Sequence, residues 1–302
     1  MKQILFILMF LFLTQCSKTS LRGSNIPIDY ILLHEKILID SIEREYVIFR
    51  PKAIKQNVIL IGLHGRGGSG EEFMWKIEFN QLAEEEGFII VYPSGINKAW
   101  VDGRKLPEED LKANDEKFLL TLKDKLQNDF SIKKFFLFGY SNGGFMTQRM
   151  AFIYPDAFTG YASVVSTISE NLNKEKPKQP VPVLFMSGTE DPIVPYRGGV
   201  INGNKGVAIG AEDTVKQWVK WNKCAPKPDA EIINEQNDGV KVFIHTYSNC
   251  KSGKPVRFLK LEGAGHGWPG KLEEEKGFGK FTNEINANRE IWKFFKDLPG
   301  KN

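Results

Sequence analysis

The segment 135–144 constrains the fold more than any other part of the chain. It reads FFLFGYSNGG, an apolar run that ends in the pattern G-x-S-x-G and is followed by a helical stretch over 145–154. A serine between a strand and a helix needs a tight turn, and Gly139 and Gly143 relieve the crowding around its strained backbone. The hydroxyl of Ser141 then stands clear at the N-terminus of a helix. The segment predicts a nucleophilic serine, with a purely structural turn as the alternative.

From residue 37 onward, short apolar runs alternate with amphipathic helical stretches, and this alternation is typical of a mainly parallel sheet flanked by helices. With 302 residues, of which 41% are hydrophobic, the chain can fill one large core. The pattern therefore predicts a single α/β domain, with the segment 229–239 as a surface connection. The expected strands are 46–50, 58–63, 88–92, 135–138, 161–165, 183–186, 242–247 and 258–261.

A nucleophilic serine needs a base, and the chain has four histidines. His34 precedes the predicted sheet, His245 falls inside an expected strand, and His64 belongs to a glycine-rich loop upstream of the serine. His266 lies in the loop 263–270, GAGHGWPG, after the last expected strand and before the final helix. Its placement and its order in the chain select His266 as the base.

The third catalytic group has to orient the imidazole and stabilise its charged form. The expected strand 183–186 leads into SGTEDP, where Glu190 and Asp191 both qualify. Asp191 precedes a proline, which biases it toward an extended or turn conformation. We therefore predict Asp191, with Glu190 as the alternative. The order serine, acid, histidine is that of α/β-hydrolases rather than of chymotrypsin or subtilisin.

Together these motifs resemble the polyhydroxybutyrate depolymerase/feruloyl esterase branch of secreted α/β-hydrolases, a group related to carbohydrate esterase family 1. The matching segments are 63–65, 100–104, 139–146, 187–196 and 265–270. The resemblance implies an α/β-hydrolase fold and hydrolysis of carboxylic esters by an exported serine enzyme. Its substrates would be feruloyl or acetyl-sugar esters or short hydroxyalkanoate oligomers. A serine peptidase or acyltransferase, or a non-catalytic surface-binding lipoprotein, is the alternative.

The same resemblance implies an oxyanion hole and a substrate pocket. The expected oxyanion donors are the backbone N–H groups of Asn142, which follows the serine, and of Arg66. Arg66 lies in the glycine-rich loop that follows an expected strand. Trp100 opens the segment WVDGR and either contacts the acyl group or belongs to a structural turn in which Asp102 pairs with Arg104. Trp268 either lines the site or pins the histidine loop.

The N-terminus reads as an export signal. Lys2 is followed by an apolar run that is shorter than the about 20 residues a membrane span needs, and this run ends near Cys16. We predict a lipoprotein-type signal over 1–16 with Cys16 as the lipidation site, although Gln15 stands where such signals usually have a small residue. A plain cleaved signal or an uncleaved anchor is the alternative. A linker over 17–36 and a catalytic domain over 37–302 follow.

Cysteine usage fits an extracytoplasmic protein that is lipid-anchored to a bacterial membrane, or otherwise secreted or periplasmic. With Cys16 lipidated or removed, Cys224 and Cys250 remain as one pair in an oxidising compartment, and they predict a disulfide. Two separate buried thiols are the alternative. The resemblance to the secreted esterases is consistent with the pairing.

The remaining sequence features exclude other classes of function. The 41 basic and 37 acidic residues give a net charge of +4, without the basic clusters that bind nucleic acid. The chain has no H-E-x-x-H, no paired C-x-x-C and no phosphate-binding loop. We therefore predict no cofactor, no metal, no nucleic acid and no partner protein, and contact with a membrane only through the N-terminal lipid.

Overall fold

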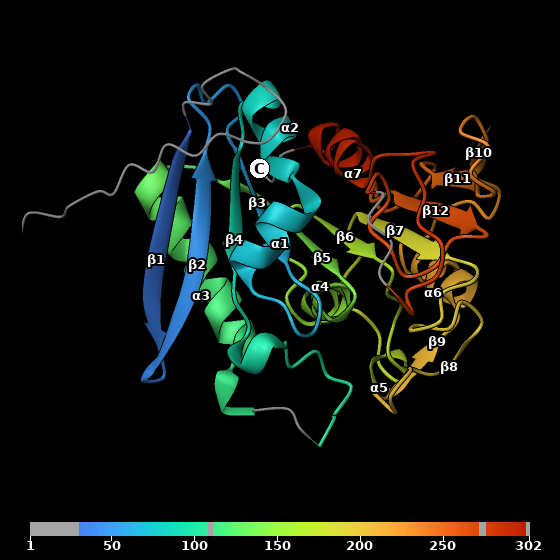
Figure 1. Ribbon diagram of the computed structural model, residues 1–302, viewed down its shortest axis with the longest axis horizontal. Helices are drawn as coiled ribbons and strands as arrows, with labels where there is room; N and C mark the ends of the chain where they lie inside the picture. The colour runs from blue at the N-terminus through green and yellow to red at the C-terminus, as the bar shows by residue number, and fades with distance from the viewer. Residues whose placement is uncertain (1–29, 108–110, 272–275, 300–302) are drawn as a thin grey trace, which may run out of the picture.

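The computed structural model describes residues 30–107, 111–271 and 276–299, so the predicted signal and its Cys16 lie outside the described residues. Within them, one ten-stranded sheet has the order β1-β2-β4-β3-β5-β6-β7-β12-β11-β10. The central strands from β4 to β12 are parallel, and the strands at both edges are antiparallel. Figure 1 shows the blue edge strands β1 and β2 on the left and the orange β10 on the right. The predicted fold class, an α/β-hydrolase-type sheet flanked by helices, is confirmed.

The strands of the large sheet are β1 (Ile31–Ile39), β2 (Ile42–Arg50), β3 (Val58–Leu63), β4 (Ile89–Pro93), β5 (Lys134–Tyr140), β6 (Gly160–Val164), β7 (Val183–Gly188), β10 (Asp229–Ile233), β11 (Lys241–Tyr247) and β12 (Val256–Glu262). A separate small sheet pairs β8 (Gly198–Val200) with β9 (Val207–Ile209). The α-helices are α1 (Gly70–Ile77), α2 (Phe79–Glu86), α3 (Asp115–Phe130), α4 (Asn142–Ile153), α5 (Glu170–Asn173), α6 (Ala211–Trp221) and α7 (Ala287–Lys296). Two 3₁₀ turns, η1 (Ile96–Lys98) and η2 (Leu111–Ala113), precede α3.

Two apolar layers sandwich the sheet, because successive side chains of a strand point to opposite faces. In β5, Phe136 and Phe138 join the layer under α1, α2 and α7, whereas Phe135 and Leu137 join the layer under α3, α4 and α6. A strand that is buried on both faces reads as a continuous apolar run, and this explains why the central strands are visible in the sequence.

The structure corrects the sequence prediction at both edges of the sheet. β1 begins at Ile31, within the linker that we predict over 17–36, so the sheet starts before the predicted boundary at residue 37. The segment 229–239, predicted as a surface connection, begins with the strand β10. Both are edge strands with many exposed side chains, and charged residues interrupt their apolar positions, so neither shows the continuous apolar run of a strand that is buried on both faces. The hairpin of β8 and β9 was also not predicted.

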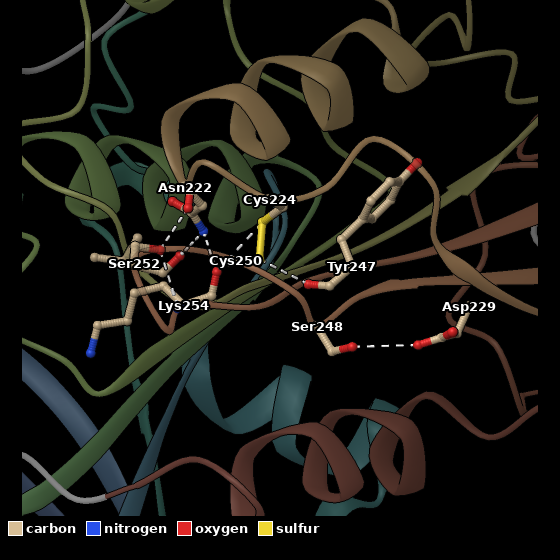
Figure 2. The surroundings of a disulfide bond; sticks show 9 residues. Asn222, Cys224, Asp229, Tyr247, Ser248, Cys250, Ser252 and Lys254 are labelled. Carbon is tan, nitrogen blue, oxygen red and sulfur yellow. Dashed lines mark hydrogen bonds between the residues drawn. A yellow bond between two sulfur atoms is a disulfide. The ribbon is translucent and has the colours of Figure 1, made fainter.

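The structure pairs Cys224 with Cys250 in a disulfide, as predicted. Figure 2 shows this bond where the end of α6 meets the segment between β11 and β12. Beside it, the buried side chain of Asn222 donates hydrogen bonds of 2.8 Å to the carbonyl oxygens of Val181 and Lys254. Covalent and hydrogen bonds thus join the end of α6 to the turn that enters β12.

The parallel strands bring several loops together at one edge of the sheet. Ser141 follows β5, Asp191 follows β7 and His266 follows β12, so all three lie beyond the carboxyl ends of neighbouring or nearby strands. This edge is where open α/β sheets bind their ligands. Among the described helices, none combines the length and the apolar character needed to cross a membrane.

Candidate active site

Ser141 occupies a strained turn between β5 and α4. Its backbone angles are φ 53° and ψ −117°, a combination that few residues other than glycine adopt. The turn is sharp enough that a Cβ on Gly139 would lie 2.2 Å from the carbonyl oxygen of Gly143. A Cβ on Gly143 would in turn lie 2.3 Å from the carbonyl oxygen of Leu63 in β3. Both glycines of the G-x-S-x-G pattern are therefore required by close backbone approach, and the turn leaves Ser141 partly exposed.

His266 lies beside this serine, with its Nε2 atom 2.8 Å from the Oγ of Ser141. Backbone contacts hold the histidine in place, because its N–H donates to the carbonyl of Phe278 at 2.6 Å. The hydroxyl of Tyr140 donates to the carbonyl of His266, also at 2.6 Å. The residue before the serine thus also fixes the loop that carries the histidine. The side chain of His266 is 2% exposed.

Asp191 completes the arrangement. One carboxylate oxygen lies 2.7 Å from Nδ1 of His266, and both side chains are buried. The other oxygen accepts hydrogen bonds of 2.8 Å from the backbone N–H groups of Ile193 and Val194. The alternative acid, Glu190, is exposed, and its backbone N–H bonds to the carbonyl of Ala264. The structure therefore brings Asp191, and not Glu190, to the histidine.

This geometry fixes the direction of the hydrogen bonds. A carboxylate only accepts, so Nδ1 of His266 carries the proton and donates to Asp191. In the neutral ring, Nε2 is then an acceptor that faces the hydroxyl of Ser141. The arrangement can remove the proton from Ser141 as its oxygen attacks an electrophile, and it can return that proton to a leaving group.

The glycine-rich loop after β3 lies next to this serine and is organised by His64. The buried imidazole contacts the carbonyl oxygen of Gly65 through Nδ1 at 2.7 Å, and its Nε2 accepts the N–H of Gly95 at 2.9 Å. Burial lowers the pKa of His64 to about 4, so the ring is neutral at pH 7 and donates from Nδ1. The ring therefore joins the loop after β3 to the segment after β4.

Asn142 is the first residue of α4, and Arg66 lies in the turn after β3. Two other N–H groups of this turn bond to protein carbonyls, that of Gly67 to Lys98 at 2.8 Å and that of Gly68 to Gly65 at 3.2 Å. That the N–H groups of Asn142 and Arg66 form an oxyanion hole stays a prediction.

The two tryptophans expected near the substrate are buried, so a pocket-lining position is wrong for both. Trp100 is 0% exposed, and its indole N–H donates to the carbonyl of His64 at 3.0 Å. Trp268 is 2% exposed, packs against Phe73, and donates to the side chain of Asn288. A side chain that is enclosed by the core cannot contact a ligand. The structural alternatives therefore hold, in which Trp268 pins the histidine loop.

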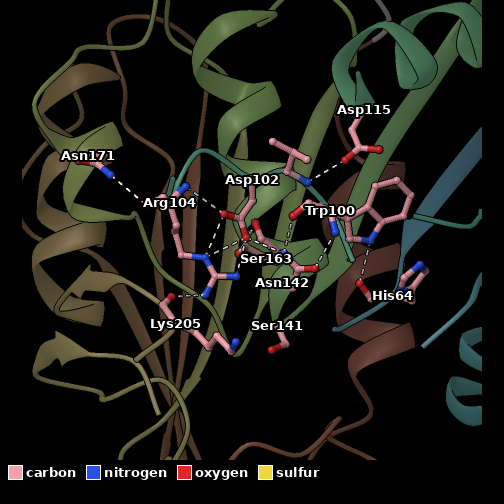
Figure 3. A network of polar contacts seen from close by, with 12 residues as sticks. His64, Trp100, Asp102, Arg104, Asp115, Ser141, Asn142, Ser163, Asn171 and Lys205 are labelled. Atoms are coloured by element: carbon pink, nitrogen blue, oxygen red, sulfur yellow. Dashed lines mark hydrogen bonds and ion pairs between the residues drawn. The ribbon is translucent and has the colours of Figure 1, made fainter. Parts of the chain in front are cut away.

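The segment 100–104 forms the structural turn in which Asp102 pairs with Arg104. Nη2 of Arg104 donates to a carboxylate oxygen of Asp102 at 2.6 Å, and both side chains are buried. Figure 3 shows that this pair lies next to Asn142, the residue after Ser141. The sequence suggested the ion pair, but it contained no signal for the contact with Asn142.

A hollow of about 610 Å³ opens beside the acid loop, between the ends of β7 and β12 and helix α6. Thr189, Glu190, Tyr196 and Lys260 are among the residues that line it. No group of three or more histidine, cysteine, aspartate or glutamate side chains is placed to hold a metal ion in the part of the chain that the structure describes.

Sequence reasoning missed Tyr140 as a support of the histidine loop. The only feature of the sequence that could have pointed to Tyr140 is its position inside the G-x-S-x-G pattern. The contact itself joins residues that are 126 positions apart in the chain, so no local pattern predicts it. His34 and His245, which the sequence set aside, lie on β1 and β11, outside the carboxyl edge where Ser141 lies.

The sequence of this chain is similar to those of several esterases. The putative esterase NocK of Nocardia uniformis subsp. tsuyamanensis is 28% identical over 69% of this chain and 64% of its own length. Feruloyl esterase B of Piromyces equi is 26% identical over 69% of this chain and 39% of its own length. Feruloyl esterase C of Emericella nidulans is 25% identical over 75% of this chain and 77% of its own length. The matched region thus covers less than two thirds of the length of the first two of these relatives.

Solved structures share the fold. An acetyl xylan esterase from Aspergillus awamori superposes with a TM-score of 0.58 at 15% identity, over 88% of this chain and 98% of its own. The feruloyl esterase module from Clostridium thermocellum gives 0.56 at 12% identity, over 97% and 98%. Residues 44–217, more than half of the chain, match the Phospholipase/Carboxylesterase family, and this match includes Ser141 and Asp191. The chain belongs to the Phospholipase/Carboxylesterase family of α/β-hydrolases.

Proposed function

We propose that this protein is an exported serine esterase that cleaves carboxylic esters through an acyl-enzyme, with Ser141, His266 and Asp191 as its catalytic triad. The observation that carries the proposal is the continuous hydrogen-bonded chain from Ser141 Oγ to His266 and on to Asp191. It lies at the carboxyl edge of the sheet, on a strained turn that the surrounding backbone enforces. The family match and the esterase relatives support the same chemistry.

In the first half-reaction, the Oγ atom of Ser141 attacks the ester carbonyl carbon while Nε2 of His266 takes the serine proton. The backbone N–H groups of Asn142 and Arg66 stabilise the negative oxygen of the tetrahedral intermediate. The carbon–oxygen bond to the alcohol then breaks, and His266 gives its proton to the leaving oxygen. Asp191 holds the ring in the required tautomer and stabilises its cationic form.

In the second half-reaction, water attacks the acyl-serine, and His266 accepts a proton from that water. The bond between the acyl carbon and Oγ breaks, and the proton returns to Ser141. The products are a carboxylic acid and an alcohol, and the enzyme is regenerated without an external cofactor.

For the substrate we propose feruloyl or acetyl esters of sugars, with short hydroxyalkanoate oligomers as the next choice. Feruloyl esterases and acetylxylan esterases are among the relatives, which supports the first two. We propose that the hydroxylated alcohol part of the ester enters the polar hollow, which Thr189 and Glu190 of the acid loop line. The disulfide between Cys224 and Cys250 supports an extracytoplasmic location. The lipid anchor on Cys16 is part of the proposal.

A hydrolysis panel tests the proposed function. It compares methyl ferulate, an acetylated xylo-oligosaccharide, a hydroxybutyrate oligomer and p-nitrophenyl acetate, with Ser141→Ala as the blank. We expect serine-dependent hydrolysis with the highest kcat/KM on a feruloyl or acetyl-sugar ester. Preference for the hydroxybutyrate oligomer would refute the choice of substrate, and activity that Ser141→Ala retains would refute the mechanism.

A further inference from the structure

The two proposed oxyanion donors lie on separate parts of the chain. Asn142 begins α4, whereas Arg66 lies in the turn after β3. An oxyanion hole requires that both N–H groups point to one atom at about 2.7–3.1 Å. Some part of the structure therefore has to fix these two segments relative to each other, and the segment 100–104 contacts both of them.

The first contact holds the side chain of Asn142. Its carbonyl oxygen accepts the backbone N–H of Trp100 at 2.8 Å. Its amide nitrogen donates to the backbone carbonyl of Trp100 at 3.0 Å and to a carboxylate oxygen of Asp102 at 2.6 Å. Figure 3 shows the Asn142 amide among these partners. A short side chain that is held by three hydrogen bonds leaves its own backbone little freedom.

The second contact holds the loop after β3. The indole N–H of Trp100 donates to the carbonyl oxygen of His64 at 3.0 Å, close to the start of the turn that carries Arg66. The imidazole of His64 packs near the indole, with ring centroids 5.0 Å apart. One residue, Trp100, thus binds Asn142 through its backbone and the His64 loop through its side chain.

The segment is itself held rigidly. Asp102 is 1% exposed, and a carboxylate buried this deeply requires a charged partner. Arg104 provides it and also donates to the carbonyl oxygen of Lys205, in the turn between β8 and β9, at 3.0 Å. The guanidinium lies 4.4 Å from the ring centroid of Phe145 in α4. The ion pair is therefore anchored both in the small sheet and on the helix that Asn142 begins.

We infer that the buried segment 100–104 positions the oxyanion hole, with Trp100 and Asp102 as positioning residues that set the backbone N–H groups of Asn142 and Arg66 relative to each other. The inference rests on the proposed function. It assigns to Trp100 an effect on the chemical step without contact with substrate, since its side chain is fully buried.

The test compares Trp100→Phe with Trp218→Phe. Both indoles are 0% exposed, and both donate one hydrogen bond of 3.0 Å, that of Trp218 to the side chain of Gln148. Each variant therefore loses the same kind of buried bond.

We expect similar losses in Tm for the two variants. Trp100→Phe should lower kcat for p-nitrophenyl acetate, and the rate of labelling by a fluorophosphonate, about 10-fold, because misplaced donors stabilise the transition state less. KM should change less than twofold, and Trp218→Phe should leave both rates within twofold.

A second pair keeps the inference testable if Trp100→Phe fails to fold. Asn142→Ala keeps the backbone N–H but removes the side chain that segment 100–104 holds, and Asn222→Ala removes another buried asparagine far from the serine. We expect about a 10-fold lower kcat in Asn142→Ala only.

Equal rates within either pair, at equal loss of Tm, would overturn the inference while leaving the proposed function intact. A wild-type protein that neither hydrolyses the ester nor takes up the fluorophosphonate would instead overturn the proposed function, and the inference with it.

Discussion

Protonation of His64 should weaken the fold as the pH falls below 6.5. The ring is 1% exposed, and burial lowers its pKa from 6.5 to about 4. Between these two values, the unfolded chain binds a proton that the folded chain does not, so the free energy of unfolding decreases with falling pH. Each pKa unit corresponds to about 1.4 kcal/mol, and the shift to about 4 therefore removes about 3 kcal/mol, all of it above pH 4.

The measurement compares urea unfolding of the wild type and His64→Gln at a series of pH values from 7.5 to 4. Glutamine does not titrate in this range and retains an acceptor for the N–H of Gly95. At pH 7.5 the wild type should be more stable, because the imidazole also bonds to the carbonyl oxygen of Gly65 and packs near the indole of Trp100. We expect this advantage to shrink by about 3 kcal/mol between pH 7.5 and 4. All other titrating groups are common to both proteins and cancel in the difference.

Parallel stability curves for the two proteins would refute this reasoning, because they would mean that His64 titrates alike in the folded and the unfolded state. An advantage that grows toward low pH would also refute it, since that sign requires a pKa above 6.5 in the folded protein.

Three further changes have expected outcomes. Replacing Cys224 and Cys250 with serine should lower the free energy of unfolding by about 3.5 kcal/mol, measured in urea without reductant, because the bond closes a loop with a sequence separation of 26. Gly143→Ala should lower both Tm and kcat by forcing α4 away from β3, and unchanged values would contradict the close approach of their backbones. Arg44→Met should destabilise the fold by about 3–5 kcal/mol in urea, because it leaves the carboxylate of Asp115 buried without its partner. Arg44→Met with Asp115→Leu should recover most of this loss.

The central fold could be predicted from the sequence because its strands are buried on both faces. β3 and β5 are apolar almost throughout, so each can be recognised as a strand from the sequence alone, before it is known which helices pack on it. The edge strand β1 has mostly exposed or half-buried side chains, and it is recognisable only through its pairing with β2. Propensity alone does not reveal a strand whose stability comes from a neighbour.

The residues of the proposed triad could be predicted because the carboxyl ends of parallel strands lie at one edge of the sheet. A residue that directly follows such a strand in the sequence is therefore expected at that edge. The supports of the site could not be found in this way. The sequence allows Trp100 either in a pocket wall or in a structural turn, since a sequence does not tell a buried tryptophan from an exposed one. The bond from Arg104 to Lys205 joins residues that are 101 positions apart, and no local pattern marks it. Such contacts depend on the packed structure alone.

The site of covalent modification by a fluorophosphonate tests most directly whether Ser141 is the nucleophile. The purified protein is labelled, its intact mass is measured, and the modified peptide is mapped. We expect a single adduct on Ser141, none in Ser141→Ala, and strongly slowed labelling in His266→Ala, since the serine loses its base. An adduct on another residue, or labelling that persists in Ser141→Ala, would contradict the assignment of Ser141 as the nucleophile.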